Sequence, residues 1–219
     1  MSGKLIVIEG LDGSGKATQT MLLGNYLNDK NIPFVKLSYP NYDSPSSALV
    51  KMYLSGDIAE DPDKVNPYAA ALFYAADRCA DFIKYHKETY DNGGLFIADR
   101  YATSNAIYQT AKLKREEWDA YIDWLYDLEY VKLQIPKPDK VIYLDMSVDV
   151  SQKLLYSRYN GDNSKRDIHE SNVEFLKKCR ETALYCADKL NWTVIKCDDG
   201  ISPLSPGEIA GIIRKESGL

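Results

Sequence analysis

The stretch LIVIEGLDGSGKATQ, residues 5–19, decides the fold of this chain. Its apolar run is followed by Gly10, Gly15 and Lys16 in the spacing G-x-x-x-x-G-K. Glycines allow a tight loop whose backbone N–H groups point inward, and a helix that begins there presents its positive end to an anion. The stretch therefore predicts a strand, a phosphate-binding loop and a helix, with Lys16 facing the terminal phosphates of a nucleoside triphosphate.

Four further apolar runs share the character of the first. Each is rich in β-branched or aromatic residues and is bounded by Gly, Pro, Asn or Asp, which is typical of buried strands in a parallel sheet. The five predicted strands are residues 5–9, 34–38, 95–99, 141–145 and 193–197. The segments between them predict helices at about 15–28, 67–90, 101–111, 115–131, 148–158, 169–190 and 206–216. This alternation indicates a three-layer α/β fold, and 219 residues suit a single domain over residues 1–219.

Composition excludes several classes of protein. The net charge is −5 at pH 7, so a general basic face for nucleic acid is not expected. The sequence contains no run of about 18 apolar residues, so we expect no membrane partner. Its four cysteines lack C-x-x-C spacing and only two histidines accompany them, which argues against a zinc site. Free thiols without an export signal predict a cytoplasmic protein.

Ala17 departs from the usual pattern of a phosphate-binding loop. The residue after the motif lysine is ordinarily Ser or Thr, whose hydroxyl helps to hold Mg²⁺. Here that residue is Ala17, and Thr18 is expected to contact the α-phosphate instead. Mg²⁺ would then depend on phosphate oxygens, water and a carboxylate. Asp99 and Glu9, both at the ends of predicted strands, are the candidates for that carboxylate.

A GTPase switch is one alternative for a chain with this loop. It requires D-x-x-G just after a strand and N-K-x-D after a later strand. Residues 91–94 read DNGG but precede their predicted strand, and Pro136 stands where the second motif needs Asn. Because neither motif has the required context, the sequence disfavours a signalling GTPase.

Two side-chain constellations favour a small-molecule kinase. Arg100 follows the third predicted strand, and ligands of open α/β sheets collect at the carboxyl ends of strands. Arg100, Ser104 and Tyr108 would share one face if a helix begins at Arg100. Tyr74 and Arg78, also four residues apart, would offer an aromatic face and a donor fork to a flat heterocycle.

A polar stretch at residues 159–167 interrupts two predicted helices. It contains Gly and Asn, and Arg158, Lys165 and Arg166 lie in or beside it. Composition alone leaves two interpretations open: a plain surface loop, or a mobile lid that brings these cations to a bound nucleotide.

Four stretches taken together resemble the thymidylate (dTMP) kinase family. They are LIVIEGLDGSGKATQ at 5–19, LFYAADR at 72–78, DRYATSNAIYQ at 99–109 and PDKVIYLD at 138–145. The block D-R-Y-x-x-S-x-x-x-Y-Q is the most specific, and the resemblance runs from about residue 4 to about residue 199. It implies a P-loop kinase fold with a five-stranded parallel sheet in the order 2-3-1-4-5 and a helical lid at about residues 158–168.

The same resemblance implies ATP-dependent phosphorylation of dTMP to dTDP in dTTP biosynthesis, with Mg²⁺ as cofactor, by a cytoplasmic homodimer. The residues implied to bind ATP are Gly10, Gly13, Ser14, Gly15, Lys16, Ala17, Thr18 and Arg166. Those implied to bind dTMP are Asp12, Tyr42, Tyr74, Arg78, Arg100, Asn105 and Tyr108. The residues implied to be catalytic are Lys16, Asp99, Arg100 and Arg158.

Individual roles follow from the family's motifs. Asp12 matches a contact to the nucleotide 3′-hydroxyl, and Arg100 matches a contact to the acceptor phosphate. Tyr74 matches a ring, ordinarily Phe, that stacks on thymine four residues before an Arg that reaches the base carbonyl. Tyr108 matches a ring that crowds the 2′ position and favours deoxyribose, and Asn105 matches a residue that lines the same pocket.

Two positive charges that are usual in the family are missing at their usual places. One often follows the proline of the second strand's loop, where this chain has Asn41 and Tyr42, so Tyr42 becomes the expected phosphate contact. The other lies beside the aspartate of the P-loop, where this chain has Gly13. In that arrangement the family takes a catalytic arginine from the lid, which favours Arg158 first and Arg166 second.

The residues by themselves leave two alternative functions open. A related kinase would act on dUMP, dCMP or a deoxynucleoside. A P-loop regulatory protein would bind a nucleotide without transferring phosphate, and Ala17 and Asn41 are the departures that favour it.

Overall fold

The computed structural model describes residues 2–59, 64–158 and 172–219. Its sheet has five strands in the order β2-β3-β1-β4-β5, and every neighbouring pair is parallel. The strands are β1 (Lys4–Gly10), β2 (Val35–Ser38), β3 (Leu95–Asp99), β4 (Lys140–Asp145) and β5 (Thr193–Lys196). Both the predicted strands and the strand order are confirmed, with strand ends that differ by at most one residue.

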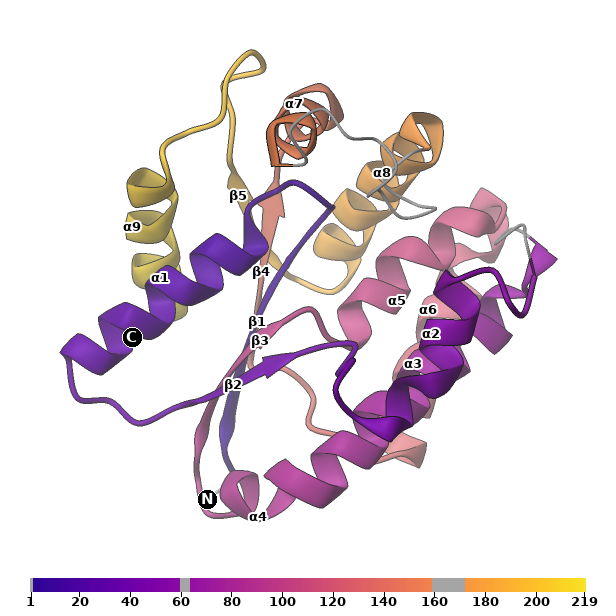
Figure 1. Cartoon of the computed structure of the whole chain (residues 1–219), viewed down its shortest axis with the longest axis horizontal. Coiled ribbons are helices and arrows are strands. Elements are labelled where there is room, and N and C mark those ends of the chain that lie inside the picture. Colours follow the sequence, from indigo (N-terminus) through magenta and orange to yellow (C-terminus); the bar gives the residue numbers. More distant parts are fainter. Residues whose placement is uncertain (1, 60–63, 159–171) are drawn as a thin grey trace.

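Helices cover both faces of the sheet, as the alternation predicts. The helices are α1 (Lys16–Asp29), α2 (Ala48–Leu54), α3 (Pro67–Asp81), α4 (Lys87–Asp91), α5 (Ala102–Tyr108), α6 (Trp118–Tyr126), α7 (Val148–Arg158), α8 (Val173–Lys189) and α9 (Pro206–Ser217). Figure 1 shows α1 and α9 on one side of the sheet and α3, α5, α6 and α8 on the other. This is the three-layer arrangement.

The alternation of side chains along β1 divides the core between the two faces. Ile6 and Ile8 pack into the apolar cluster under α1 and α9, whereas Leu5 and Val7 pack into the cluster under α5 and α8. All four are at most 1% exposed, so β1 is buried on both faces, as expected for a central parallel strand. The β1 register places Ile8 beside Asp99 and Gly10 beside Leu144, which brings three strand ends to one edge.

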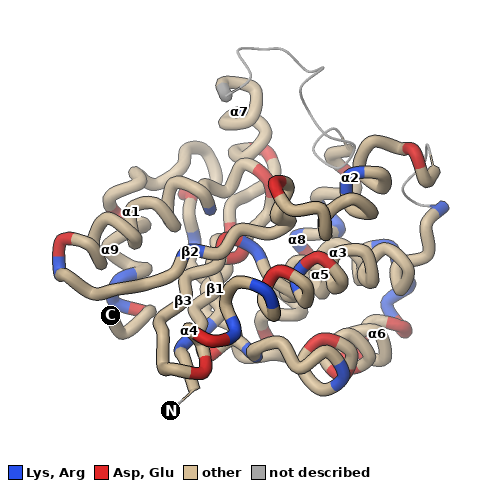
Figure 2. The backbone as a smooth tube through the Cα atoms, turned by 60° about the horizontal axis from the view of Figure 1, so that its bottom comes forward, with Lys and Arg blue, Asp and Glu red and all other residues tan. Residues whose placement is uncertain are grey.

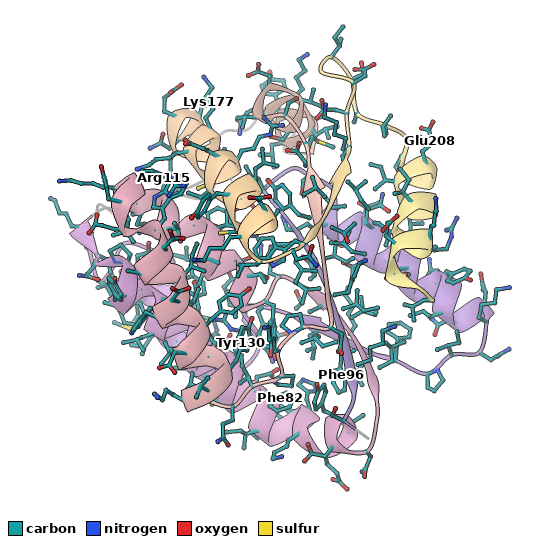
Figure 3. The ribbon with its side chains drawn as sticks, turned by 180° about the vertical axis from the view of Figure 1, so that it is seen from behind. Phe82, Phe96, Arg115, Tyr130, Lys177 and Glu208 are labelled. Carbon is teal, nitrogen blue, oxygen red and sulfur yellow. The ribbon has the colours of Figure 1, made fainter. Side chains whose placement is uncertain are left out.

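The far end of the second cluster is built from aromatic rings. Phe82 and Phe96 each lie 5.8 Å from Tyr90, measured between ring centroids. In Figure 3 these two phenylalanines lie together near the end of the sheet, while Lys177 and Glu208 extend outward from α8 and α9. The face opposite the strand carboxyl ends is therefore closed by packing.

Several of the helical predictions need correction. No element was expected at residues 48–54, where α2 forms, because a helix this short depends on packing, here of Val50 and Tyr53. The helix predicted at 67–90 is α3 and α4 separated by a π-helical stretch, Phe82–His86. The helix predicted at 115–131 begins as a 3₁₀ turn at Arg115–Glu117, and after α6 it continues as a π-helical stretch, Asp127–Lys132.

The surface mixes charges of both signs. Lys and Arg positions interleave with Asp and Glu positions along the tube in Figure 2. Within the described part of the chain, no helix is both long enough and apolar enough to cross a membrane.

Candidate active site

The loop between β1 and α1 has the conformation that its glycines permit. Gly13 has a φ of 80°, and a Cβ atom there would lie 2.7 Å from the backbone oxygen of Ser151. Only glycine fits both conditions. Gly15 caps α1 with a φ of 87°, so the helix starts directly at Lys16 with its first N–H groups turned toward the loop.

Lys16 is a buried cation at the start of this helix. Only 7% of the residue is exposed, and its Nζ donates a hydrogen bond to the backbone oxygen of Leu11 at 2.8 Å. Burial, and then repulsion from Arg100, lower the pKa of Lys16 to about 8. A poorly solvated positive charge of this kind gains when an anion arrives beside it.

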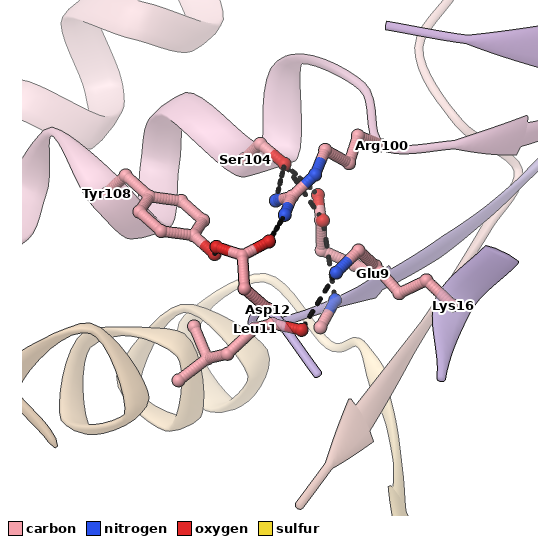
Figure 4. A network of polar contacts seen from close by, with 8 residues as sticks. Glu9, Leu11, Asp12, Lys16, Arg100, Ser104 and Tyr108 are labelled. Carbon is pink, nitrogen blue, oxygen red and sulfur yellow. Dashed lines mark hydrogen bonds and ion pairs between the residues drawn. The ribbon is translucent and has the colours of Figure 1, made fainter. Parts of the chain in front are cut away.

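Arg100 reaches the phosphate loop through an unusual backbone turn. It follows β3 with a φ of 65°, in the left-handed region that residues with a side chain seldom adopt. Its Nη2 forms an ion pair with Asp12, and its Nη1 donates to Ser104 Oγ at 3.4 Å (Figure 4). Its guanidinium lies 5.3 Å from the centre of the Tyr108 ring. Burial would lower the pKa of Arg100, but Asp12 and Tyr108 raise it well above its ordinary value.

This geometry corrects the expected helix at residues 101–111. The α-helical part, α5, begins at Ala102 and ends at Tyr108, and a 3₁₀ turn, Thr110–Lys112, follows. Arg100 therefore lies outside the helix, and its contacts with Ser104 and Tyr108 come from the left-handed turn. Tyr108 also donates its hydroxyl to Asp12 Oδ2 at 2.8 Å, so Asp12 is held by two residues of this segment.

The two carboxylates proposed for Mg²⁺ lie in different surroundings. Glu9 is fully buried and accepts hydrogen bonds from Thr103 Oγ1 at 2.7 Å and Ser104 Oγ at 2.9 Å. Burial raises the pKa of Glu9 in spite of the nearby Arg100. Asp99, in contrast, lines the cavity beside Lys16. Within the described residues no cluster of three or more His, Cys, Asp or Glu side chains could hold a metal ion.

One cavity lies on the α3 and α5 side of Arg100. It brings together all seven residues assigned to dTMP from the sequence, which are Asp12, Tyr42, Tyr74, Arg78, Arg100, Asn105 and Tyr108. The other lining residues are Tyr39, Pro40, Leu54, Tyr101, Ser104 and Gln109. The sequence also offers Phe73, next to Tyr74, as a ring that could share the stacking role. Phe73 and Tyr74 both pack against the apolar cluster around Tyr53, but Phe73 does not line this cavity.

The polar side chains of this cavity are fixed from behind. Arg78 is paired with Glu129, and Asn105 Nδ2 donates to the backbone oxygen of Ala71 at 3.2 Å. Gln109 lies at the end of the quoted D-R-Y block, and its Oε1 is buried without a hydrogen-bond partner among the described residues. Sequence reasoning missed Gln109 as a lining residue although the block contained it.

Asn41, which stands where the resemblance leads one to expect an arginine, is held by two carboxylates of α3. Its backbone N–H donates to Asp77 Oδ2 at 2.9 Å, and its Nδ2 donates to Asp81 Oδ1 at 2.7 Å. Tyr39 also donates its hydroxyl to Asp81, at 2.8 Å. The loop that carries Tyr42 is thus tied to α3 by two carboxylates.

A second cavity lies over the start of α1. It is lined by Asp12, Gly13, Ser14, Gly15, Lys16, Ala17, Thr18, Gln19, Asp99 and Arg100, and on its apolar side by Met146, Leu154, Leu155, Pro203, Leu204, Pro206 and Ile209. Gly10, assigned to ATP from the sequence, lies in β1 and does not line it. Part of this apolar wall, from Pro203 to Ile209, lies in residues 198–219, a segment whose sequence suggests a border for the adenine but contains no motif that names a contact.

The two cavities meet. Asp12 and Arg100 line both of them, so a ligand in one cavity lies next to a ligand in the other. Arg158 is the last residue of α7, and its side chain lies outside the described part of the chain. Arg166 and the rest of the predicted lid lie outside the described residues as well.

Comparisons with known proteins identify the family of this chain. The family model for thymidylate kinase matches residues 8–204. A probable thymidylate kinase of Thermococcus gammatolerans is 29% identical over 217 residues, covering 98% of this chain and 97% of its own. One of Thermococcus onnurineus is 33% identical over 186 residues, covering 84% of each chain.

The solved structure of thymidylate kinase from Candida albicans shares the fold. It matches with a TM-score of 0.67 at 21% identity and covers 99% of this chain and 93% of that one. The fold, the phosphate loop and the match over most of the length lead to one conclusion. The chain belongs to the thymidylate kinase family.

Proposed function

We propose that this protein transfers the γ-phosphoryl group of ATP to the 5′-phosphate of dTMP and releases ADP and dTDP. The observation that carries the proposal is the meeting of the two cavities at Asp12 and Arg100. One cavity begins at a loop built for phosphates, and the other combines tyrosine rings with a buried arginine. Membership of the thymidylate kinase family supports the same reaction.

In the acceptor cavity, each side chain has a part that its chemistry allows. Arg100 would bind the acceptor phosphate and Asp12 would accept from the 3′-hydroxyl of the sugar. Tyr74 would stack on the base, and Arg78 would donate to a base carbonyl. Tyr108 would fill the space beside the 2′ position and so favour deoxyribose. Asn105 and Tyr42 line the same cavity, and the proposal gives them the base and the phosphate respectively.

Catalysis would rest on alignment and on neutralising the negative charge that spreads over the transferred group. The acceptor is already an anionic phosphate, so no strong general base is needed. One of its oxygens bonds to the γ-phosphorus as the bond from that phosphorus to the oxygen bridging the β-phosphate breaks. Lys16 and the loop N–H groups would hold the donor, Arg100 the acceptor, and Arg158 or Arg166 would close over both.

The residues present fit Mg²⁺ held chiefly by the nucleotide. Ala17 supplies no hydroxyl, and both oxygens of Glu9 are already hydrogen-bonded in a fully buried site. Asp99 lines the donor cavity and is the carboxylate placed to hold the ion, directly or through water. When bound, the ion neutralises charge on the phosphate oxygens. The proposal also includes a cytoplasmic homodimer, which the resemblance of the sequence implies.

An acceptor panel tests this function. ADP release from ATP is measured with dTMP, dUMP, dCMP, thymidine and no acceptor. We expect dTMP to give the highest kcat/KM, thymidine to give almost none because it lacks the phosphate that Arg100 would bind, and the blank to be slow. Preference for another pyrimidine nucleotide would reassign the substrate, and a panel without phosphoryl transfer would support a regulatory nucleotide-binding protein.

A further inference from the structure

A buried ion pair supports the floor of the acceptor cavity. Arg78 Nη2 pairs with Glu129 Oε1, and Arg78 Nε approaches Glu129 Oε2 at 3.4 Å. The two side chains are 3% and 0% exposed. Glu129 belongs to the π-helical stretch Asp127–Lys132, and it continues the buried side of α6 four residues after Leu125. A carboxylate thus stands where the pattern of that helix calls for an apolar residue.

Stability alone does not explain such a pair. Removing two charges from water costs as much as their attraction returns, and apolar side chains of similar size often stabilise a core better. What the pair does provide is geometry, because a carboxylate that engages the Nε edge of a guanidinium fixes the plane of the whole group. Burial would lower the pKa of Arg78, but Glu129 raises it, so the group stays charged.

The fixed plane leaves one edge of Arg78 for a ligand. Nε and Nη2 are engaged by Glu129, and Nη1 makes no hydrogen bond to the residues that the structure describes. Arg78 lines the acceptor cavity with Tyr74, whereas Glu129 does not. The only hydrogen-bonding role open to Nη1 is donation, since a guanidinium carries no acceptor.

We propose that Glu129 is a positioning residue that sets the base selectivity of the acceptor cavity. By locking Arg78 as a donor of fixed direction, it favours a pyrimidine with a carbonyl at position 4, as in thymine and uracil. Cytosine carries an amino group at position 4. That group is itself a donor, so it would face the Nη1 donor with no acceptor between them. This inference rests on the proposed function, because it takes the ligand of this cavity to be a pyrimidine nucleotide.

The Glu129→Gln variant separates this role from simple support of the fold. The amide keeps the shape but loses the charge and the paired acceptors that hold Arg78. We expect the Kd and KM for dTMP to rise about tenfold, the kcat to stay within about twofold, and the preference for dTMP over dCMP to fall about tenfold. Calorimetry gives the Kd values, and the coupled ADP assay gives the rates.

Asp127→Asn is the matched control. Asp127 lies on the same π-helical stretch, its side chain is 50% exposed, and it pairs with Lys132 at 3.4 Å on the surface. The same chemical change there should leave dTMP affinity, dCMP affinity and turnover unchanged. Glu129→Asp is the second variant, in case Glu129→Gln does not fold: it keeps the charge but withdraws the carboxylate by one methylene, and it should also weaken dTMP more than dCMP.

Three results would overturn the inference. The first is a folded Glu129→Gln with wild-type selectivity. The second is a loss shared equally by dTMP and dCMP, or a loss of kcat alone. The third is failure of both Glu129 variants to fold, which would make the pair purely structural. If the wild-type protein binds neither dTMP nor dCMP, the proposed function itself is rejected, and this inference falls with it. If the wild-type protein turns over dTMP and the Glu129 variants keep its affinity and selectivity, only the inference is rejected.

Discussion

At the residue scale, the site holds the charged side chains of Lys16, Arg100 and Asp12 close together. Lys16 is buried at the start of α1, Arg100 is half-buried at the turn after β3, and the two cations repel each other. Asp12 offsets this by pairing with Arg100, and Leu11 does so by accepting from Lys16. Phosphate groups bound beside Lys16 and Arg100 would weaken the repulsion between these two cations.

Lys16 leads to a prediction about pH. Its pKa is lowered to about 8, so it is charged below that pH and loses its proton as the pH rises through it. We expect the Kd for ATP, measured by calorimetry, to be steady near pH 7 and to rise above pH 8 by as much as about tenfold for each further pH unit. Lys16→Arg, which stays charged at every accessible pH, should bind more weakly but without this slope. A wild-type Kd that is flat to about pH 9.5 would contradict the prediction.

At the element scale, short segments rather than long helices shape the acceptor cavity. The loop after β2 is fastened to α3 through Asp77 and Asp81, and the left-handed turn at Arg100 precedes α5. A π-helical stretch supplies Glu129. Such segments are common where side chains must point at a ligand, because regular helices leave few choices of direction.

The end of α7 leads to a prediction about the lid. This helix brings Leu154 and Leu155 to the donor cavity and ends at Arg158, where the predicted lid begins. Since the P-loop carries Gly13 beside its aspartate, we expect Arg158→Ala to lower kcat by about 10³-fold, by analogy with arginine fingers. The Kd for dTMP should change little.

Arg166→Ala is the comparison for that experiment, assayed under the same conditions. If Arg158→Ala turns over normally and Arg166→Ala does not, the catalytic role belongs to the exit of the lid. If both turn over normally, transfer does not depend on a lid arginine.

At the scale of the whole molecule, the parallel sheet collects the chemistry at one edge. The carboxyl ends of β1, β3 and β4 lie side by side there and carry the phosphate loop, Asp99 with Arg100, and Asp145. Asp145 is paired with Arg180 of α8 at 2.7 Å, which ties that edge to the helical layer. Both cavities open on the same edge, which is where open α/β sheets bind ligands.

The shared boundary of the cavities leads to a prediction about linked ligands. A single molecule that joins adenosine to thymidine through a chain of phosphates should occupy both cavities, since they meet at Asp12 and Arg100. We expect it to bind about 10²-fold or more tightly than ATP, and to raise Tm further than ATP and dTMP together, because the second contact becomes intramolecular. An adenosine compound with the same phosphate chain and no thymidine is the control. Equal affinity for the two compounds would show that the cavities are not occupied together.

The sequence allowed the strands, their order and the phosphate loop to be predicted, and the structure confirms the strands and their order. It also led us to a set of residues for dTMP that the structure brings to one cavity. It did not lead us to α2, to any named contact in the apolar wall at Pro203 and Leu204, or to Glu129 behind Arg78. One local clue was available, since Glu129 interrupts the apolar side of a helix.

What the sequence by itself determined is therefore what repeats locally or matches a motif: apolar runs bounded by turn residues, and glycines ahead of a lysine. The tertiary structure alone decided which distant side chains meet. Arg78 and Glu129 are 51 residues apart, and Asn41 and Asp77 are 36 apart. Such pairs form because packing of whole helices on the sheet brings them together and removes them from water, and neither partner carries a signal of the other in its own neighbourhood.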